Sequence, residues 1–245
     1  MVISGWNKKY SEILYEFKYS EKQDTESAII LDSILRKTVS IKKIQGKIKG
    51  KTVFVIGAGP SLSLAIPVLK NFKNTVKIVA DSAVKILVEN GIKPDIVVTD
   101  LDGDEDSLIK VGNTDSIFVV HAHGDNIAKL CLAENFKNRI GTTQSKPFRN
   151  IQNFGGFTDG DRAVFLASHF GAEKIILFGM DFGEKIGRYS QTKISERKIK
   201  LKKLRRAKSL LEWLSGKTRS HLFTTSSPIR GFEKIPYDKV DMIIT

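Results

Sequence analysis

The 245-residue chain has 41% hydrophobic and 27% charged residues, an ordinary balance for a globular protein that buries a core. Its one cysteine, Cys131, excludes a disulfide framework within the chain, and no stretch approaches the ~20 apolar residues of a membrane span. The first residues lack the apolar core of a signal peptide, so we expect a cytoplasmic protein that does not enter a membrane. The net charge of +13 favours a polyanionic partner such as a triphosphate or a nucleic acid.

The first fifty residues are predicted to be helical. Apolar residues at helical spacing predict an amphipathic helix over Trp6–Phe17. A second helix is expected from about Thr25 to Ile44, with Asp24 or Thr25 as its cap. The basic, glycine-containing run Lys42–Lys51 is interpreted as the join to the main domain.

From residue 52 onward, short β-branched runs alternate with helical stretches. The expected strands are Thr52–Ile56, Val76–Ala80, Asp95–Thr99, Ser116–Val120 and Lys174–Phe178, with a minor strand near Arg139–Thr142. The expected helices between them are Leu62–Asn71, Ala83–Asn90, Asp106–Val111, Asn126–Asn135 and Asp161–Phe170. This alternation predicts an α/β, Rossmann-like fold with a mostly parallel sheet flanked by helices.

A leucine stripe near the C-terminus predicts a long basic helix over Ser195–Leu214, ended by Gly216. The tail is expected to add an edge strand at Val240–Ile244. We therefore expect an N-terminal helical segment (1–50), a Rossmann-like core (51–184), and a basic helix with a C-terminal tail that packs on the core (185–245).

Polar residues and glycines follow each of the five main strands. They are Gly57-Ala58-Gly59-Pro60-Ser61, Asp81, Asp100-Leu101-Asp102, His121-Ala122-His123-Gly124-Asp125 and, after Gly179 and Met180, Asp181. Ligands bind at the carboxyl ends of strands in open parallel sheets. Five such endings at one edge predict a crevice that binds anions and metal.

The glycine loop 57–61 precedes a predicted helix, and a helix N-terminus attracts phosphate. Leu62 occupies the position where the G-x-G-x-x-G fingerprint requires glycine, so a nicotinamide dinucleotide is not favoured. The run Gly46 to Thr52, which ends in Gly50-Lys51-Thr52, is one residue shorter than a P-loop motif. It also precedes a predicted strand, whereas a P-loop follows one. Phosphate binding is favoured over a simple tight turn capped by Ser61.

Asp100 and Asp102 are separated by one residue, so on an extended backbone their carboxylates point to the same side. Such a pair beside a phosphate site suits Mg²⁺. An EF-hand is excluded, because Glu105 stands where that loop needs glycine and Val111 where it needs glutamate. The alternative is a solvated acidic turn in which Asp104 or Asp106 caps a helix.

Two further motifs allow a binding role. His121-x-His123-x-Asp125 is typical of Zn²⁺ or Mn²⁺ ligands, but Asn126 stands where a dinuclear hydrolase of the metallo-β-lactamase fold has another histidine. Hydrogen bonding to substrate or phosphate is therefore favoured. In the run from Gly155 to Arg162, Thr158 or Asp159 is a natural helix cap. The run holds two carboxylates, more than a cap needs, which favours a role in a binding site.

Together these segments resemble the archaeal 6-hydroxymethyl-7,8-dihydropterin pyrophosphokinases of the MptE type. The segments that carry the resemblance are Val55–Leu62, Val98–Asp104, His121–Asn126, Asn153–Arg162 and Gly179–Gly183. A fainter likeness to thiamine pyrophosphokinases rests on Thr99–Asp102 and Thr158-Asp159. The resemblance implies Mg²⁺-dependent transfer of diphosphate from ATP to the hydroxyl of a reduced hydroxymethylpterin, with AMP released.

The resemblance also implies roles for particular residues. The expected metal ligands and catalytic residues are Asp100, Asp102, Asp159 and, for charge neutralisation, Arg162. Asp102 or Asp159 is expected to orient or deprotonate the hydroxyl. The expected nucleotide-binding residues are Gly57, Gly59, Ser61, Asp81, His121 and His123, and the expected pterin-binding residues are Asn153, Phe154, Phe157 and Asp181.

Two other functions stay open. A nucleotide-dependent or sugar-nucleotide-dependent transferase on the same fold is conceivable. A nucleic-acid-binding module is less favoured, although residues 185–219 hold 13 Lys and Arg against two Glu. The sequence leaves homo-oligomerisation and the role of this basic helix open.

Overall fold

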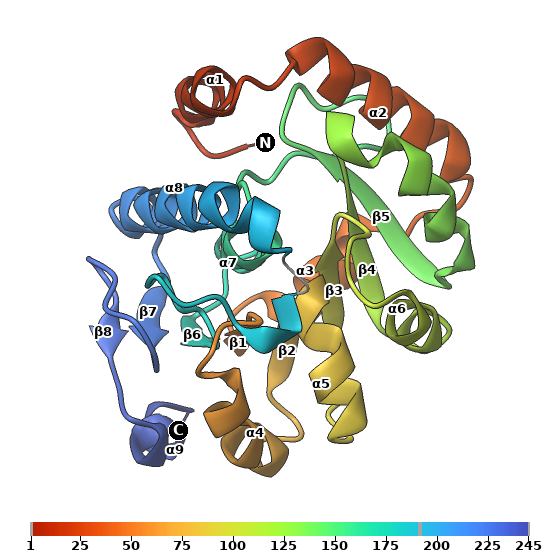
Figure 1. Cartoon of the computed structure of the whole chain (residues 1–245). Coiled ribbons are helices and arrows are strands. Elements are labelled where there is room, and N and C mark those ends of the chain that lie inside the picture. The colour runs from red at the N-terminus through yellow and green to blue at the C-terminus, as the bar shows by residue number, and fades with distance from the viewer. Residues whose placement is uncertain (1, 191–192, 245) are drawn as a thin grey trace.

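The computed structural model describes residues 2–190 and 193–244. Within these ranges, eight strands form one sheet in the order β5-β4-β3-β2-β1-β6-β7-β8, and each neighbouring pair is parallel (Figure 1). The strands are β1 (Thr52–Ile56), β2 (Val76–Ala80), β3 (Ile96–Thr99), β4 (Ile117–Ala122), β5 (Asn138–Thr143), β6 (Lys174–Phe178), β7 (His221–Thr224) and β8 (Glu233–Lys234). The expected α/β fold with a parallel sheet is confirmed.

Helices connect and cover the strands. The α-helices are α1 (Trp6–Phe17), α2 (Glu21–Ile34), α3 (Ile41–Ile48), α4 (Leu62–Asn71), α5 (Val84–Glu89), α6 (Glu105–Gly112), α7 (Asp159–His169), α8 (Arg197–Ser215) and α9 (Val240–Ile244). A 3₁₀ helix, η2 (Gly124–Asn135), links β4 to β5. None of the helices in the described ranges is long and apolar enough to cross a bilayer.

The chain reverses direction across the sheet at β1. From β1 it adds strands one by one out to β5, and then α7 carries it back to β6 on the other side of β1. This reversal creates a topological switch point between the carboxyl ends of β1 and β6, where open α/β sheets bind ligands. The sheet therefore places a ligand site beside the segments 57–61 and 179–183.

Alternation along the buried strands divides the core into two layers. In β1, Val53 and Val55 join an apolar cluster with residues of α1, α3, α7 and α8, whereas Phe54 and Ile56 join a second cluster with residues of α2, α4, α5 and α6. Both faces are covered, so the strands are apolar on both sides, as parallel strands usually are.

Two expectations about element type are wrong. The predicted helix 25–44 is two helices, α2 and α3, because Ser40 caps α3 through the backbone N–H of Lys43, and the N–H of Val39 donates to the carbonyl of Arg139 beside β5. The segment Val240–Ile244 is helix α9, in which Val240 is fully buried, and not an edge strand. The sheet edge is formed instead by β7 and β8.

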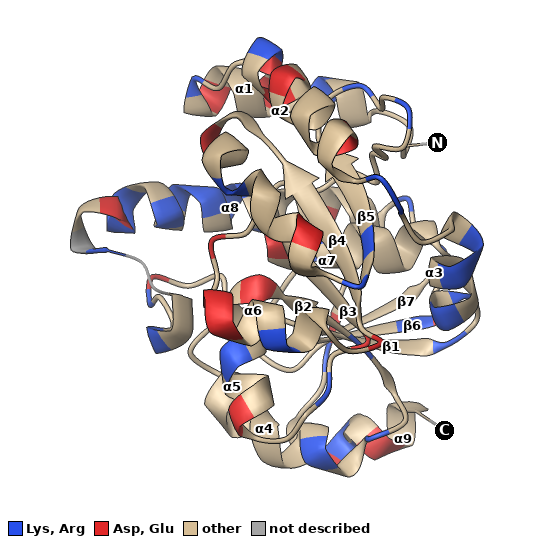
Figure 2. Cartoon of the chain, turned by 90° about the vertical axis from the view of Figure 1, so that its right-hand side faces the viewer, with Lys and Arg blue, Asp and Glu red and all other residues tan. Residues whose placement is uncertain are grey.

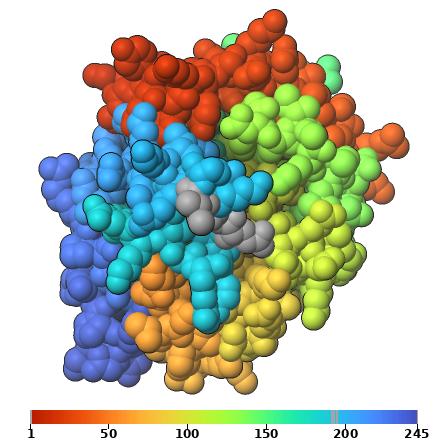
Figure 3. Space-filling view, in the orientation of Figure 1, coloured from red at the N-terminus to blue at the C-terminus, as the bar shows by residue number. Residues whose placement is uncertain are grey.

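The basic helix α8 lies against α1 and over the sheet edge. Arg206 pairs with Glu12 and Glu16 of α1, and Lys202 donates to the backbone carbonyl of Glu16. Figure 2 shows Lys and Arg along α8, and Figure 3 shows its first part, in light blue, between the N-terminal helices and the orange segment after β1. Part of the positive charge of α8 therefore holds the fold together and is not free for a polyanion.

Candidate active site

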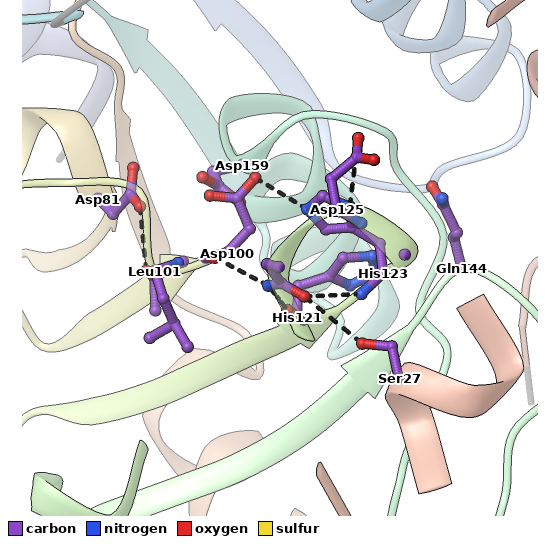
Figure 4. Close-up of polar contacts among 12 residues, drawn as sticks. Ser27, Asp81, Asp100, Leu101, His121, His123, Asp125, Gln144 and Asp159 are labelled. Atoms are coloured by element: carbon purple, nitrogen blue, oxygen red, sulfur yellow. Dashed lines mark hydrogen bonds and ion pairs between the residues drawn. The ribbon is translucent and has the colours of Figure 1, made fainter. Parts of the chain in front are cut away.

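Four aspartates from three segments converge at the carboxyl edge of the sheet. One carboxylate oxygen from each of Asp81, Asp100, Asp102 and Asp159 lies within 4.8 Å of those of the others. Asp81 directly follows β2, Asp100 directly follows β3, and Asp159 is the first residue of α7, as the close-up shows (Figure 4). We refer to these four residues as the carboxylate cluster.

The segment after β3 does not continue as an extended strand. Leu101 has a φ of 70° and is buried, and its N–H donates to the hydroxyl of Thr99 at 2.8 Å. Asp81 accepts hydrogen bonds from the hydroxyl of Thr99 and from the N–H of Gly103. Asp100 and Asp102 are thus brought together by a turn anchored on Asp81, and the expected extended backbone is wrong.

The close carboxylates shift one another's pKa values. Burial, and then the charge of Asp100, raises the pKa of Asp81 and of Asp159. The charge of Asp81, followed by desolvation and the charge of Asp100, raises the pKa of Asp102 to about 9. For Asp100, burial works in the opposite direction, but hydrogen bonding to His123 and the charges of His123 and Arg162 lower its pKa. The cluster therefore concentrates more negative charge than it can hold ionised without a cation.

The carboxylate cluster fits Mg²⁺ by its donor chemistry. All four candidate ligands are carboxylate oxygens, which hard divalent cations prefer. Oδ1 of Asp100 is buried and makes no hydrogen bond to the described residues, so it has a free coordination position. Asp81, expected to bind the nucleotide, lies among the expected metal residues Asp100, Asp102 and Asp159.

The N-terminus of α7 fixes Asp159 and Arg162. Asp161 accepts hydrogen bonds from the N–H groups of Phe157 and Thr158, so its buried carboxylate caps the helix start. This leaves Asp159 to face the carboxylate cluster, where its Oδ1 lies 3.3 Å from Nη1 of the buried Arg162. A side chain at Gly156 would lie 2.6 Å from the Cα atom of Arg162, so this glycine allows close backbone packing.

A cleft of roughly 700 Å³, counted with its open mouth, lies at the switch point between β1 and β6. It is lined by Gly57–Pro60, Asp81, Asp159, Gly179–Phe182, Lys185, Lys200 and Lys203, among others. We refer to it as the switch-point cleft. The lining combines carboxylates with lysines from the segment before α8 and from α8 itself, which suits an anionic ligand bound together with a cation.

The glycine loop lines this cleft, but the amides of Gly57, Gly59 and Ser61 are already used. The N–H of Gly57 donates to Phe178, that of Gly59 donates to Gly179, and both the N–H and the hydroxyl of Ser61 donate to Asp181. These glycines let the ends of β1 and β6 approach each other closely. The cationic side chains among the described lining residues of the cleft are Lys185, Lys200 and Lys203.

We expect Gly59→Ala to destabilise the protein, because its Cβ would lie 2.6 Å from the carbonyl oxygen of Gly179. An overpacked contact of this kind costs about 1–3 kcal/mol. The control is Gly46→Ala in α3, where no atom lies within 4 Å of the added Cβ, and alanine there should stabilise the helix by up to about 1 kcal/mol. Thermal unfolding measures both. Equal melting temperatures for Gly59→Ala and the parent protein would contradict the prediction.

Two histidines lie on the other side of the carboxylate cluster from the switch-point cleft. Nε2 of His123 is 3.4 Å from Oδ2 of Asp100. His121 is buried, its Nδ1 lies 3.2 Å from the hydroxyl of Thr142, and burial, together with the charge of Arg162, lowers its pKa. Asp125 is largely exposed, and the metal-compatible cluster found in the described residues contains aspartates alone. The geometry favours hydrogen-bonding histidines over histidine metal ligands.

The structure does not bring three of the expected pterin-binding residues into the switch-point cleft. The amide of Asn153 donates to the carbonyls of Gln144 and Ser145 and accepts from Gly155, which fixes the local backbone. Phe154 packs on His169 and Phe170, and Phe157 packs on Phe17 and Tyr19. Asp181 does line the cleft, where it accepts hydrogen bonds from Ser61.

Sequence reasoning missed Gln144, which comes directly after β5 and is buried. A minor strand near residues 139–142 was expected. Polar residues after the other strands are site candidates, and the same rule applied to this strand would have identified Gln144. It also missed Asp24, a buried residue of α2 that accepts hydrogen bonds from Tyr10, Gly124 and Gln144. No local signal in α2 marks that contact, which joins residues far apart in the chain.

Comparison with known proteins agrees with this site. A family model described as 6-hydroxymethylpterin diphosphokinase MptE-like matches residues 30–187. A protein of Methanocaldococcus jannaschii named 6-hydroxymethyl-7,8-dihydropterin pyrophosphokinase is 45% identical over 235 residues, which cover 89% of this chain and 97% of the relative. Proteins with the same name from Pyrococcus furiosus and Methanothermobacter thermautotrophicus are 41% and 39% identical over 90% and 87% of this chain, and 97% and 95% of the relatives.

Among solved structures, the MAf glycosyltransferase from Magnetospirillum magneticum AMB-1 is similar, with a TM-score of 0.57 and 15% sequence identity. The match covers 91% of this chain and 39% of that chain, and at such low identity it supports the fold alone. The sequence relatives match the chain over nearly their full lengths. The chain belongs to the MptE-like family of 6-hydroxymethylpterin diphosphokinases.

Proposed function

We propose that this protein transfers diphosphate from ATP to the hydroxyl of 6-hydroxymethyl-7,8-dihydropterin in a Mg²⁺-dependent reaction that releases AMP. The observation that carries the proposal is the carboxylate cluster, two members of which, Asp81 and Asp159, line a cleft that lysines also line, at the switch point of the sheet. The names of the relatives support the pterin substrate and the diphosphokinase reaction.

In this proposal the triphosphate lies in the switch-point cleft. Lys185, Lys200 and Lys203 bind phosphate oxygens there, since their side chains line it. The four residues of the carboxylate cluster hold Mg²⁺, which when bound would neutralise charge on the transferred phosphates. Diphosphate transfer needs positioning and charge neutralisation more than covalent help from the protein.

The oxygen of the pterin hydroxymethyl group attacks the β-phosphorus of ATP. The bond between this phosphorus and the oxygen shared with the α-phosphate breaks, and AMP leaves with that oxygen. The hydroxyl proton passes to a carboxylate oxygen of Asp102 or Asp159, because each of these residues offers one oxygen to the metal and has a second oxygen that can accept a proton. Arg162 holds Asp159 in place through its Nη1.

A product assay tests this proposal. Enzyme, ATP, Mg²⁺ and 6-hydroxymethyl-7,8-dihydropterin are incubated, and the nucleotides and pterins are separated. We expect one AMP for each pterin diphosphate, and no reaction when EDTA removes the metal. ADP in place of AMP would mean attack at the γ-phosphorus, and turnover independent of pterin would refute the substrate.

A further inference from the structure

A second group of polar side chains lies at the carboxyl ends of β4 and β5. His121 in β4 and Thr142 in β5 are paired across the two strands, and Gln144 follows Thr142 by two residues. We refer to these three residues as the β4–β5 polar cluster. In the sheet order, β4 and β5 lie beyond β3, on the side opposite β1 and β6. Neighbouring strands lie about 5 Å apart, so across the sheet His121 on β4 lies about one strand spacing from Asp100, and Gln144 after β5 lies about two.

Figure 4 shows the same arrangement in space: Asp81 lies to one side of Asp100 and Asp159, and His121, His123 and Gln144 lie to the other. The carboxylate cluster therefore lies between the switch-point cleft and the β4–β5 polar cluster. The switch-point cleft on one side is lined by lysines and suits the triphosphate. None of the three side chains of the β4–β5 polar cluster is a lysine or an arginine, and their hydrogen-bonding groups suit an uncharged polar ligand.

The hydrogen bonds of His121 fix its tautomer. The hydroxyl of Thr142 donates its single proton to the carbonyl of Val120 at 3.1 Å. Nδ1 of His121, 3.2 Å from the same hydroxyl oxygen, must then be the donor of that contact. In the neutral imidazole, Nε2 consequently carries a lone pair, and this atom is buried without a partner among the described residues. His121 therefore presents an unused hydrogen-bond acceptor.

Gln144 presents a second unused acceptor. Its Nε2 donates to Oδ2 of Asp24 at 2.9 Å, which determines the orientation of the amide because a carboxylate requires a donor. Oε1 is then directed away from Asp24 and is buried without a partner in the described part of the chain. The backbone of Gln144 is held as well, because its carbonyl accepts from Trp6 and Asn153. Only 3% of the residue is exposed.

Two buried acceptors without partners are costly unless a ligand supplies donors. A 2-amino-4-oxo pterin ring has two adjacent donors on its pyrimidine edge, the 2-amino group and N3–H. The corresponding edge of adenine has one donor, the 6-amino group, beside one acceptor, N1. If adenine were bound here, N1 would face one of the two protein acceptors, and no hydrogen bond could form between them. The chemistry of the β4–β5 polar cluster thus matches the pterin better than the base of ATP.

We propose that Nε2 of His121 and Oε1 of Gln144 accept hydrogen bonds from the 2-amino and N3–H groups of the pterin, and that they set the specificity for the 2-amino-4-oxo ring. This inference rests on the proposed function. It places the pterin over β4 and β5 and the triphosphate over β1 and β6, with the carboxylate cluster between the two reacting groups. His121 then contacts the pterin and not the nucleotide.

The test compares two substrates, 6-hydroxymethyl-7,8-dihydropterin and its analogue with a carbonyl in place of the 2-amino group. A site that hydrogen-bonds a substrate amino group rejects an analogue without it, and we expect kcat/KM to favour the pterin by at least about 10²-fold in the parent enzyme. The analogue keeps N3–H, so of Gln144→Leu and His121→Phe the variant that removes the partner of the 2-amino group should lower this preference at least tenfold, mainly through a higher KM for the pterin. The variant that removes the partner of N3–H should raise the KM of both substrates alike. Neither variant should change the KM for ATP. The control Gln152→Leu changes the same residue type beside Thr142 and should keep the preference.

The outcomes are separable. Retention of the parent preference by both variants would show that neither residue accepts from the 2-amino group and would overturn the inference. A changed KM for ATP with an unchanged pterin preference would assign these residues to the nucleotide and overturn it too. Absence of pterin-dependent AMP release by the parent enzyme would instead refute the proposed function, and the inference with it. Two separate variants guard against a folding defect in one of them.

Discussion

Asp100→Asn is expected to lower kcat by about 10³-fold, because the variant loses a carboxylate that holds Mg²⁺ and with it ~4 kcal/mol of transition-state stabilisation. Asp100 is the member of the carboxylate cluster whose pKa is lowered, against the effect of burial, by His123 and Arg162, so it supplies a negative charge that its neighbours hold less readily. Steady-state kinetics at saturating ATP and pterin measures the effect. Asparagine keeps the size of the side chain, so packing should change little.

The matched control for this prediction is Asp95→Asn at the opposite end of the same strand. Asp95 accepts from the N–H of Lys77 and pairs with Lys47, so it is a structural carboxylate of β3 far from the reacting groups. Its replacement should leave kcat within about twofold of the parent while stability falls slightly. In addition, Mg²⁺ should raise the melting temperature of the Asp95 variant but raise that of the Asp100 variant much less. Full turnover by Asp100→Asn would refute the metal site.

Arg162→Ala is expected to lower kcat by about 10²-fold. Arg162 is the cation beside Asp159, whose pKa is already raised by burial and by Asp100 and Asp81. Loss of the guanidinium would raise the pKa of Asp159 further, and it would remove a buried positive charge near the transferred phosphates. Kinetics with purified, folded variant at saturating substrates measures the change, and circular dichroism checks the fold.

Arg139→Ala is the control for this second prediction. Arg139 resembles Arg162 in having a buried Nε without a partner among the described residues, but it lies near the start of β5 and donates to the carbonyls of Phe136 and Glu134. Its removal should reduce stability and leave kcat nearly unchanged. Similar kinetic losses in both variants would mean that Arg162 acts through stability alone, and its assigned charge role would be wrong.

The amino-acid sequence by itself determined the central sheet. The bounds of β1, β2 and β6 and of α1 and α4 agree with the expected ranges, because each is a local signal: a β-branched run bounded by polar residues, or apolar residues at helical spacing. It also determined that carboxylates, histidines and glycines follow these strands. In a parallel sheet all such residues must lie at one edge, so the position of the site followed from the pattern.

The tertiary structure decided which of these residues meet and what each one does. Leu101 turns the backbone between Asp100 and Asp102, and the contact of Asp81 with Thr99 and Gly103 helps to bring four carboxylates from three segments into one cluster. The break between α2 and α3 and the helical form of Val240–Ile244 also depend on distant partners. These features depend in part on contacts between segments far apart in the chain, which no local pattern encodes, although the Ser40 cap of α3 is a local signal.

The roles of Gly59 and Gln144 show the same limit. A glycine after a strand is typical of a phosphate loop, but here the N–H of Gly59 bonds to Gly179, a partner 120 residues away in the chain. Gln144 belongs to no sequence motif. Asp24 of α2 accepts a hydrogen bond from its side-chain nitrogen and so fixes the orientation of the amide, which leaves Oε1 without a partner among the described residues. Sequence thus determined the types of chemical group at the site, and packing between distant segments determined which of their hydrogen bonds remain for a ligand.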